Sequence, residues 1–599
     1  MYLKNLEITN FRKIKEAKFE FIPGLNVIVG ANNIGKTALV DALRSLLAGH
    51  EEPYTRITIE DIHRESSSSA VSGDITFKFL FSGLTHEDEA DFLPALVPSD
   101  DGFDALITIN YSVADVATGR MRPKRWCGEH EEIGLNSDML ENLRGVYLQP
   151  LRDASLGLKP GRASQMAKLL RLLGDGDEAG KAKVEATLEQ FDKDLKQSAP
   201  IKETQKAISG RHKTMLGDQL AQLLEVGISG TDFNKLSARI SLQADEFDID
   251  QNGLGYNNLI YMAVVLSEMV EDSTVTYRGL IVEEPEAHLH PQLQYILLEY
   301  LQNIKSDEGK DGDPVQVFVT SHSPNFSSIA DLESLICLVN SDKSVTAFLP
   351  RKINFDIDSK KHLKKRSKLK RYLDVTRAEL FFARRVVFVE GAAELLLVSA
   401  FSKKLGSGFE LRDHAISLIS VEGLNFDCFL PMFGEKALRI PVSVITDSDP
   451  YKIELSDGKN KRVADYPDLT DSITISDNVE NLKKSEDELV EVFCGVKTLE
   501  YDLALYEGNR KVMLDALAEI HPEIAKNLKA IVDKETGNKE KAKALFCGMF
   551  ERGPGKTNVQ KGRFAQELAQ LVEDDGIDFE VPSYIKNALE HVCKYKGSV

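Results

Sequence analysis

The sequence lacks the features that would place it in a membrane or in an oxidising compartment. No apolar run approaches the roughly 18 residues that a membrane helix needs, and the N-terminus has early charges and no apolar signal-peptide core. The six cysteines among 599 residues are scattered and form no C-x-x-C pair, so neither a zinc module nor a disulfide framework is indicated. We therefore expect a cytoplasmic protein that does not associate with membranes.

Positive charge is outnumbered, with 74 Lys and Arg against 94 Asp and Glu, but it is concentrated in one cluster. The net charge of -20 argues against a polycation that coats nucleic acid, although binding depends on the local field and a basic groove would suffice. The cluster lies within residues 360–371 and consists of Lys360, Lys361, Lys364, Lys365, Arg366, Lys368, Lys370 and Arg371. A solvated linker or helix face explains it as well as a contact with a DNA backbone does.

The chain is too long for one hydrophobic core, and its pattern changes along its length. Strand-like and helical runs alternate over residues 1–158, whereas residues 159–245 carry charged helical patterns, including KTMLGDQLAQLLEVG, and no strand signals. Alternation returns over residues 246–375 and again in residues 376–599, whose later part is mostly helical. We predict α/β domains interrupted by a helical insertion, which is either a dimerisation arm or a solvated helical hairpin.

The motif GANNIGKT predicts a phosphate-binding loop, because a strand-like run precedes it and an amphipathic helix follows. Gly30 and Gly35 permit a tight backbone path whose N–H groups point at the β-phosphate. Lys36 supplies a positive charge to the β- and γ-phosphates, and the Thr37 hydroxyl ligates Mg²⁺. We expect this loop, with Asn33, to bind ATP.

Two later segments complete the predicted nucleotide site. The run GLIVEEPEAHLHP ends an apolar strand in paired carboxylates, where Glu283 would hold Mg²⁺ through water and Glu284 would polarise the attacking water. A third strand-like run ends in TSHSP, where His322 can reach a γ-phosphate. A lone histidine after a strand is more often structural, but its place behind the other two motifs favours the nucleotide site.

Four acidic residues farther along predict a second site. Glu390 ends the strand-like run RRVVFVEG, and Glu394 projects beside it if a helix begins at Ala392. Asp447 and Asp449 lie two apart at a strand end, so both should point to one side. Each pair alone is usually a turn or a solvated helix face, but the joint pattern is more specific. Because clustered carboxylates repel one another, we expect two Mg²⁺ or Mn²⁺ ions to neutralise them.

The order of NFR, GANNIGKT, EEPEAHLHP and TSHSP resembles the ABC-type ATPase heads of the SMC and RecF group. The resemblance implies that Gln149, in YLQPLRD, is the Q-loop residue that senses the metal. It also implies that residues 251–258 take the place of the signature motif that caps ATP on a partner subunit. The chain departs from that group in lacking LSGGQ and in having Glu283 where aspartate is usual, which suggests slow hydrolysis.

The acidic pattern resembles the Toprim domain, and the chain as a whole resembles the OLD (overcoming lysogenization defect) family, which includes the nuclease subunit of the Gabija phage-defence system. TLEYDLA then places Glu500 as an additional metal ligand, and KGRFAQEL offers Lys561 to stabilise the developing phosphorane charge. The resemblance implies an ABC/SMC-like ATPase head with a helical dimerisation insertion, followed by a Toprim domain with a helical insertion of its own.

The family resemblance implies a metal-dependent DNA endonuclease that nicks or cuts both strands under control of the ATPase, in defence against phage. It also implies a homodimer or higher oligomer, acting alone, with a UvrD-like helicase, or with a reverse transcriptase and its RNA–DNA product. Slow hydrolysis favours a gate in which nucleotide holds the nuclease back. An alternative is a RecF- or SMC-like repair ATPase with a non-catalytic Toprim scaffold. A topoisomerase would need a nucleophilic tyrosine in a DNA-gate domain, for which the sequence offers no candidate module.

Overall fold

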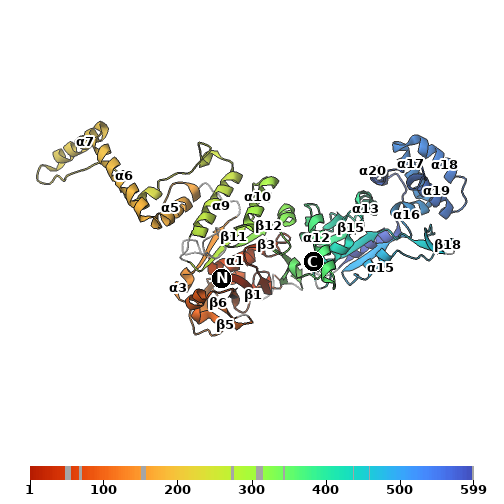
Figure 1. Ribbon diagram of the computed structural model, residues 1–599, viewed down its shortest axis with the longest axis horizontal. Coiled ribbons are helices and arrows are strands. Elements are labelled where there is room, and N and C mark those ends of the chain that lie inside the picture. The colour runs from red at the N-terminus through yellow and green to blue at the C-terminus, as the bar shows by residue number, and fades with distance from the viewer. Residues whose placement is uncertain are drawn as a thin grey trace.

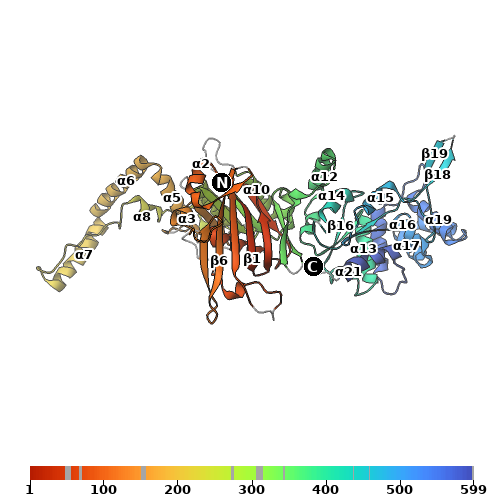
Figure 2. The same ribbon diagram turned by 90° about the horizontal axis from the view of Figure 1, so that it is seen from below.

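The computed structural model is elongated (Figure 1). A helical arm, an α/β head, a second α/β domain and a cluster of helices follow one another along its longest axis (Figures 1 and 2). The structure describes residues 1–47, 56–66, 71–100, 102–149, 157–162, 164–271, 275–304, 315–341, 344–435, 437–456 and 459–595. Within these ranges no helix combines the length and the apolar character that a membrane crossing requires.

The head contains an antiparallel sheet, formed by β1 Tyr2–Phe11, β2 Ile14–Glu20, β4 Ile75–Ser82, β5 Leu96–Ser99, β6 Gly102–Asp115 and β7 Arg120–Cys127. Its strand order is β2-β1-β4-β6-β5, and β7 pairs with β6. Alternate residues of β4 (Ile75, Phe77, Phe79 and Phe81) are fully buried. This period of two is what a sheet shows when one of its faces packs on a core.

The second sheet of the head carries the nucleotide motifs. Its strands are β3 Leu25–Val29, β8 Leu143–Leu148, β11 Tyr277–Glu283, β12 Gln316–Ser321, β13 Leu335–Ser341 and β14 Ser344–Phe348. The order is β14-β13-β3-β12-β11-β8, and all neighbours are parallel except β13 and β14. Every residue of β3, β11 and β12 is buried, as in a sheet covered on both faces. The carboxyl ends of the parallel strands therefore meet at one edge, where ligands bind in such sheets.

The arm confirms that helices and no long strands occupy the predicted insertion. It contains α5 Gln165–Asp175, α6 Glu178–Gln197, α7 Ala199–Leu216 and the short α8 Phe233–Ser237. The helical pattern of KTMLGDQLAQLLEVG is wrong beyond Leu216, because Gly217 ends α7 with a φ of +75° and residues 217–232 form no helix. The chain returns to the head through α9 Leu254–Glu271 and α10 Pro291–Gln302.

The second α/β domain is built on a four-stranded parallel sheet in the order β16-β15-β17-β20. Its strands are β15 Arg385–Val389, β16 Ile416–Ser420, β17 Val442–Thr446 and β20 Val490–Cys494. Helix α13, Ala392–Lys404, packs against α20, Lys561–Val572, whereas α21, Ser583–Lys594, packs on β15, β17 and β20. As in the head, the carboxyl ends of these strands lie at one edge of the sheet.

Further elements surround this domain. They are α12 Ser359–Tyr372, α14 Phe426–Phe429, the hairpin of β18 Tyr451–Ser456 and β19 Lys459–Ala464, α15 Asp477–Lys483, α16 Leu499–Leu505, α17 Glu507–Ile520, α18 Pro522–Val532 and α19 Asn538–Phe550. The run from α16 to α20 confirms that residues from about 500 onward are mostly helical. Helix α12 stands between the head and the second domain (Figure 2).

Candidate nucleotide and metal sites

The phosphate-binding loop lies between β3 and the start of α1, Lys36–Leu47. Gly30 and Gly35 have φ values of +149° and +120°, which side chains other than glycine rarely allow. A Cβ at Gly30 would also lie 2.8 Å from the Leu338 carbonyl oxygen. The Lys36 ammonium donates to the carbonyl oxygens of Gly30, at 2.5 Å, and Ala31, at 3.0 Å. Burial lowers the pKa of Lys36 to about 8, so an anion bound beside it would stabilise its charged form.

The paired carboxylates lie beside this loop because β11 ends at Glu283 two strands away from β3. Tyr147 donates its hydroxyl to Glu283 Oε2 at 2.5 Å, and burial raises the pKa of Glu283. Glu284 follows with a φ of +46°, and its Oε1 lies 3.2 Å from His322 Nε2. The structure thus brings Glu284 and His322 together, while water activation and γ-phosphate contact stay predictions for them.

Sequence reasoning missed the third carboxylate of EEPE. One oxygen of Glu286 accepts hydrogen bonds from the Ser321 hydroxyl and the His322 N–H, both at 2.8 Å. The other is buried and has no partner among the described residues, and burial raises the pKa of this carboxyl. Glu286 therefore fixes the loop that carries His322. Its place three residues after Glu283 in the same motif was the available signal.

The remaining nucleotide-site residues lie at the expected edge, and their roles stay predictions. Thr37 is exposed in the first turn of α1, and Gln149 is exposed directly after β8. The other half of YLQPLRD, residues 150–153, lies outside the described residues. In the signature region α9 begins at Leu254, and a Cβ at Gly255 would lie 2.7 Å from the His288 carbonyl oxygen. The signature region is thus held against the loop that follows the paired carboxylates.

The second site lies at the carboxyl edge of the β16-β15-β17-β20 sheet. Glu390 follows β15 and Asp447 follows β17, and these two strands are parallel neighbours. Glu390 Oε1 accepts hydrogen bonds from the Thr446 hydroxyl, at 2.5 Å, and the Asp447 N–H, at 2.8 Å. Helix α13 begins at Ala392, as predicted, which places the buried Glu394 in its first turn.

One detail of the prediction is wrong. Strand β17 ends at Thr446, so the alternation of a strand does not apply to Asp447 and Asp449. Asp449 is exposed and has a φ of +43°, whereas the neighbours whose charges act on Asp447 are Glu390, Glu500, Lys561 and Glu394. Asp449 therefore lies at the rim of the site, outside the cluster around Asp447.

The clustered groups perturb one another strongly. Burial and the charges of Glu390 and Glu500 raise the pKa of Asp447 well above its usual range, and burial followed by the charge of Glu500 raises the pKa of Glu394. Lys561 Nζ lies 2.8 Å from Glu500 Oε2. Burial alone would lower the pKa of Lys561, but the charges of Glu500 and Asp447 raise it. The structure thus brings together five groups that lie as far as 171 positions apart in the sequence.

The donor set fits a hard divalent cation. All four clustered carboxylates offer oxygen, and Glu500 Oε1 is buried without a hydrogen-bond partner among the described residues. Across the described chain no three His, Cys, Asp or Glu side chains stand in coordinating positions. One oxygen of Glu390 and one of Asp447 each accept a backbone N–H. Oxygen-only sites of this kind select Mg²⁺ or Mn²⁺.

A supporting loop, residues 495–499, was not predicted. Buried Asp502 accepts hydrogen bonds from the N–H groups of Val496, at 3.1 Å, and Lys497, at 3.0 Å, and burial raises its pKa to about 8. The loop ends with the Leu499 N–H donating to Asp447 Oδ1 at 3.0 Å. Asp502 therefore positions both Asp447 and the start of the helix that carries Glu500. Its place two residues after Glu500 in TLEYDLA was the only signal.

Gly495→Ala is expected to disturb this loop. The added Cβ would lie 1.6 Å from Asp502 Oδ2, which is closer than any real contact, so the loop or the carboxylate must move. We expect a loss of about 1–3 kcal/mol in the free energy of unfolding and lower activity of the carboxylate site. Thermal melting measures the first, with Gly508→Ala as control. Gly508 lies in α17 with nothing within 4 Å, so alanine there should be neutral or stabilising. Equal melting temperatures for the two variants would contradict the positioning role of the loop.

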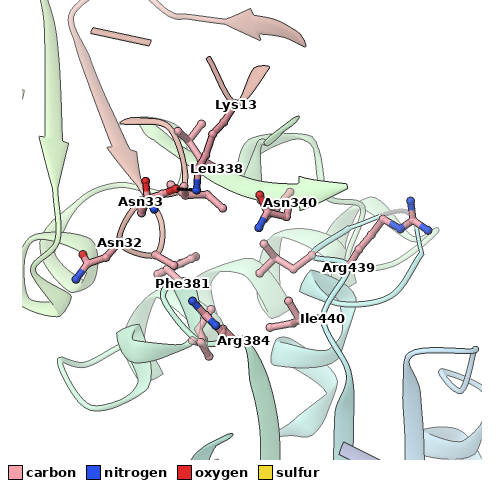
Figure 3. A pocket seen from close by; sticks show the side chains of 15 residues that line it. Lys13, Asn32, Asn33, Leu338, Asn340, Phe381, Arg384, Arg439 and Ile440 are labelled. Carbon is pink, nitrogen blue, oxygen red and sulfur yellow. Dashed lines mark hydrogen bonds between the residues drawn. The ribbon is translucent and has the colours of Figure 1, made fainter. Parts of the chain in front are cut away.

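A cavity of about 130 Å³ separates the phosphate-binding loop from the second domain (Figure 3). Asn32 and Asn33 line it from the loop, and Phe381 and Arg384 line it from the other domain. Lys13 donates its ammonium to the Asn33 carbonyl oxygen at 2.6 Å. The nucleotide loop and the domain with the carboxylate cluster therefore share a boundary.

Two family models match the chain. The model described as AAA ATPase domain matches residues 1–112 and 158–326, and the model described as overcoming lysogenization defect protein-like, TOPRIM domain, matches residues 381–449. Domains of these kinds use a nucleotide and a divalent metal ion. This confirms the two predicted chemistries at that level.

Relatives extend the match over most of the chain. An OLD nuclease from Thermus scotoductus is 26% identical over 488 residues, which cover 77% of this chain and 84% of the relative. An endonuclease GajA from Bacillus cereus (strain HuB5-5) is 23% identical over 99% of both chains. The solved C-terminal region of the Xanthomonas campestris pv. campestris OLD protein is 28% identical and covers 36% of this chain and 94% of its own, with a TM-score of 0.25, too low for a structural argument. The chain is thus a homologue of the OLD nuclease and of endonuclease GajA, and it joins an AAA ATPase domain to an OLD-like TOPRIM domain.

Proposed function

We propose that the chain is a metal-dependent DNA endonuclease whose ATP-binding head regulates cleavage. The observation that carries the proposal is the cluster of Glu390, Glu394, Asp447, Glu500 and Lys561 at the carboxyl edge of the TOPRIM sheet. The names of the relatives, a nuclease and an endonuclease, support it. The resemblance to the OLD family extends the proposal to defence against phage, alone or with a helicase or reverse transcriptase.

The residues of the cluster have distinct roles in this proposal. Glu390, Glu394, Asp447 and Glu500 hold two Mg²⁺ or Mn²⁺ ions, with Asp449 at the rim. When bound, such a pair activates water and stabilises the oxygens of an in-line displacement. Lys561 is held by Glu500 at the mouth of the cluster, where its charge can stabilise the phosphorane. Glu500 thus both completes the cluster and positions the lysine.

The nucleotide site is assigned in the same way. Gly30, Asn33, Gly35 and Lys36 cradle the phosphates of ATP, and Thr37, Glu283 and Gln149 hold or sense its Mg²⁺. Glu284 orients the attacking water, and His322 contacts the γ-phosphate. The proposal divides the chain into head segments 1–158 and 246–375, the arm 159–245 and the TOPRIM domain 376–599.

The arm is proposed to join two copies of the chain. Helices α6 and α7 bury no residue, although isolated helices depend on packing for most of their stability. Phe191 and Met215 on these helices are 55% and 82% exposed, and Leu223 of the following segment is 89% exposed. A second copy would cover these apolar side chains, which a solvated hairpin would leave in water.

The test is the nicking of supercoiled plasmid. We expect relaxed and linear products with Mg²⁺ or Mn²⁺ and none with EDTA, because the carboxylates alone only repel the DNA phosphates. Agarose gels measure the rate with each ion. DNA binding and ATP binding without cleavage under any ion would instead support a RecF- or SMC-like ATPase with a non-catalytic TOPRIM scaffold.

A further inference from the structure

Helix α12, which carries the basic cluster, forms one wall of a groove of about 570 Å³. Lys361, Lys365 and Lys368 line the groove from this helix. The opposite walls come from the α14 region, including Leu424 and Asp427, and from α15 and the turn after it, through Asn478, Asn481 and Ser485. In Figure 2, α12, α14 and α15 are labelled along the same side of the TOPRIM domain.

The basic residues of α12 lie on three faces of the helix: one faces the groove, one contacts the head and one points outward. Lys361, Lys365 and Lys368 follow the i, i+4, i+7 spacing of one helical stripe, which faces the groove. Arg366 pairs with Glu333 of the head at 2.6 Å, and Lys370 pairs with Asp331 beside it. These two residues therefore fasten the helix to the head. The cluster is neither a uniform solvated face nor a uniform binding surface.

Both opposite walls of the groove are tied to the carboxylate cluster. The Gly423 N–H donates to the Glu390 carbonyl oxygen at 2.7 Å, and the next residue, Leu424, lines the groove. On the other wall, the Ser476 N–H donates to the carbonyl oxygen of Ser448, which stands between Asp447 and Asp449, at 3.1 Å. Asn478, two residues on, again lines the groove. A ligand in the groove would thus lie beside the cluster.

The chemistry of the groove suits an extended polyanion. Lys365 pairs with Asp356 at 3.0 Å and Lys368 with Asp427 at 2.7 Å, whereas Lys361 has no ion pair among the described residues. The exposed Lys483 and Lys484 at the end of α15 add charge at the opposite wall. Amide and hydroxyl side chains such as Asn478, Asn481 and Ser485 commonly bind phosphate oxygens. The lining holds three lysines against two aspartates, Asp356 and Asp427, which is a small positive excess in a chain of net charge -20.

We propose that the groove between α12, α14 and α15 binds the phosphate backbone of DNA and leads it to the carboxylate cluster. The inference rests on the proposed nuclease function and adds the surface that holds its substrate. The ion pairs of Lys365 and Lys368 then exchange a carboxylate for a phosphate when DNA enters. The lysine stripe of α12 thus binds DNA because it lies beside the carboxylate cluster, while Arg366 and Lys370 fasten the helix to the head.

The test measures equilibrium binding of a fluorescein-labelled 30-base-pair duplex, and of the matching single strand, by anisotropy in EDTA, where cleavage cannot occur. Lys361→Gln with Lys365→Gln is expected to weaken binding about tenfold and to lower the slope of log affinity against log salt by about 2. The control is Lys360→Gln with Arg371→Gln, which removes the same charge from the outward face of α12. It should change affinity by less than about threefold, since exposed charges beyond the contact are screened. Equal losses of DNA affinity in the two double variants would contradict the proposal that the groove binds DNA.

Asp427→Asn distinguishes a DNA-binding groove from a purely structural ion pair, because the two predict different changes in DNA affinity. Removing this carboxylate frees Lys368 and makes the groove more positive, so DNA affinity should rise about threefold and the salt slope should steepen. If the pair only braces the domain, affinity stays the same or falls. Lys361→Glu serves as a third variant, because this side chain makes no ion pair whose loss could unfold the protein. If Lys361→Glu leaves both DNA affinity and plasmid cleavage unchanged, the proposal that the groove binds DNA is wrong, but the proposed nuclease function stands. A wild-type chain that neither binds nor cuts DNA refutes both.

Discussion

Asp447→Asn and Glu390→Gln are each expected to lower the rate of plasmid nicking about 1,000-fold or more. Each substitution removes an anionic oxygen from the cluster that holds the metal ions. Electrostatic stabilisation by such ions contributes several kcal/mol, and about 4 kcal/mol corresponds to a factor of 1,000. The rate of conversion of supercoiled to relaxed plasmid, at saturating Mg²⁺ or Mn²⁺, measures the loss.

The same Asp447→Asn variant is expected to melt at the same temperature as the wild type or higher. Burial and two neighbouring carboxylates raise the pKa of Asp447, which means that its charge opposes folding at neutral pH. Asparagine removes that charge, and its side-chain oxygen can still accept the Leu499 N–H that Asp447 accepts at 3.0 Å. Nicking activity, measured with metal ions, and the melting temperature, measured in metal-free buffer, should therefore change in opposite directions. A variant that is merely misfolded would lose both.

The matched control is Glu422→Gln at the same edge of the sheet. Glu422 precedes Gly423, which bonds the Glu390 backbone, but its own side chain is exposed and pairs with Arg377 at 2.7 Å. Its neutralisation should leave nicking within about twofold of wild type, because the exposed Glu422 carboxylate is not among the clustered groups and the buried Arg377 keeps its ion pair with Asp374 at 2.6 Å. Undiminished nicking in Asp447→Asn would contradict the proposed mechanism and favour a non-catalytic scaffold.

The sequence predicted the parts of both sites that lie in continuous motifs. GANNIGKT, the Glu283–Glu284 pair and the Glu390–Glu394 pair each depend on one strand and the turn or helix that follows, so local spacing predicts their geometry. The contacts between motifs could not be predicted in this way. The bond between Glu390 and the Asp447 N–H exists only because β15 and β17 are neighbours, and sheet order is set by packing between distant segments.

The contacts that sequence reasoning missed also depend on packing between distant segments. Tyr147 reaches Glu283 because β8 pairs with β11, although 136 positions separate the two residues. The basic helix was left undecided because its residues look alike in sequence, and only the positions of the head and the groove divide them among three faces. In the arm, a helical pattern continues past Leu216, but the chain there is irregular and lies along α6, where the Ile228 N–H donates to Asp192 Oδ1 at 2.8 Å. Whether such a segment becomes helical depends on its packing, which the local pattern does not contain.

Lys36→Ala is expected to weaken ATP binding about 100-fold and to leave metal-dependent nicking intact. The Lys36 ammonium is the buried cation of the phosphate loop. In the proposed site it donates two charge-assisted hydrogen bonds to the β- and γ-phosphates, and their loss, at about 1.5–3 kcal/mol each, accounts for that factor. Calorimetric titration with ATP measures the affinity. Lys15→Ala is the control, because this lysine is exposed and pairs with Glu65 at 2.8 Å, away from the loop.

The same variant tests whether nucleotide holds the nuclease back. The loop borders the cavity whose far side is formed by Phe381 and Arg384, just before β15, which Glu390 follows. A phosphate that draws Lys36 away from the Gly30 and Ala31 carbonyls would change the conformation of the loop. Because the loop lines the cavity, the shape of the cavity wall would change with it. We therefore expect ATP to slow nicking by the wild type and to leave Lys36→Ala unaffected. Nicking that requires ATP turnover, and is lost in Lys36→Ala, would reverse the direction of coupling: hydrolysis at Glu284 would then drive cleavage.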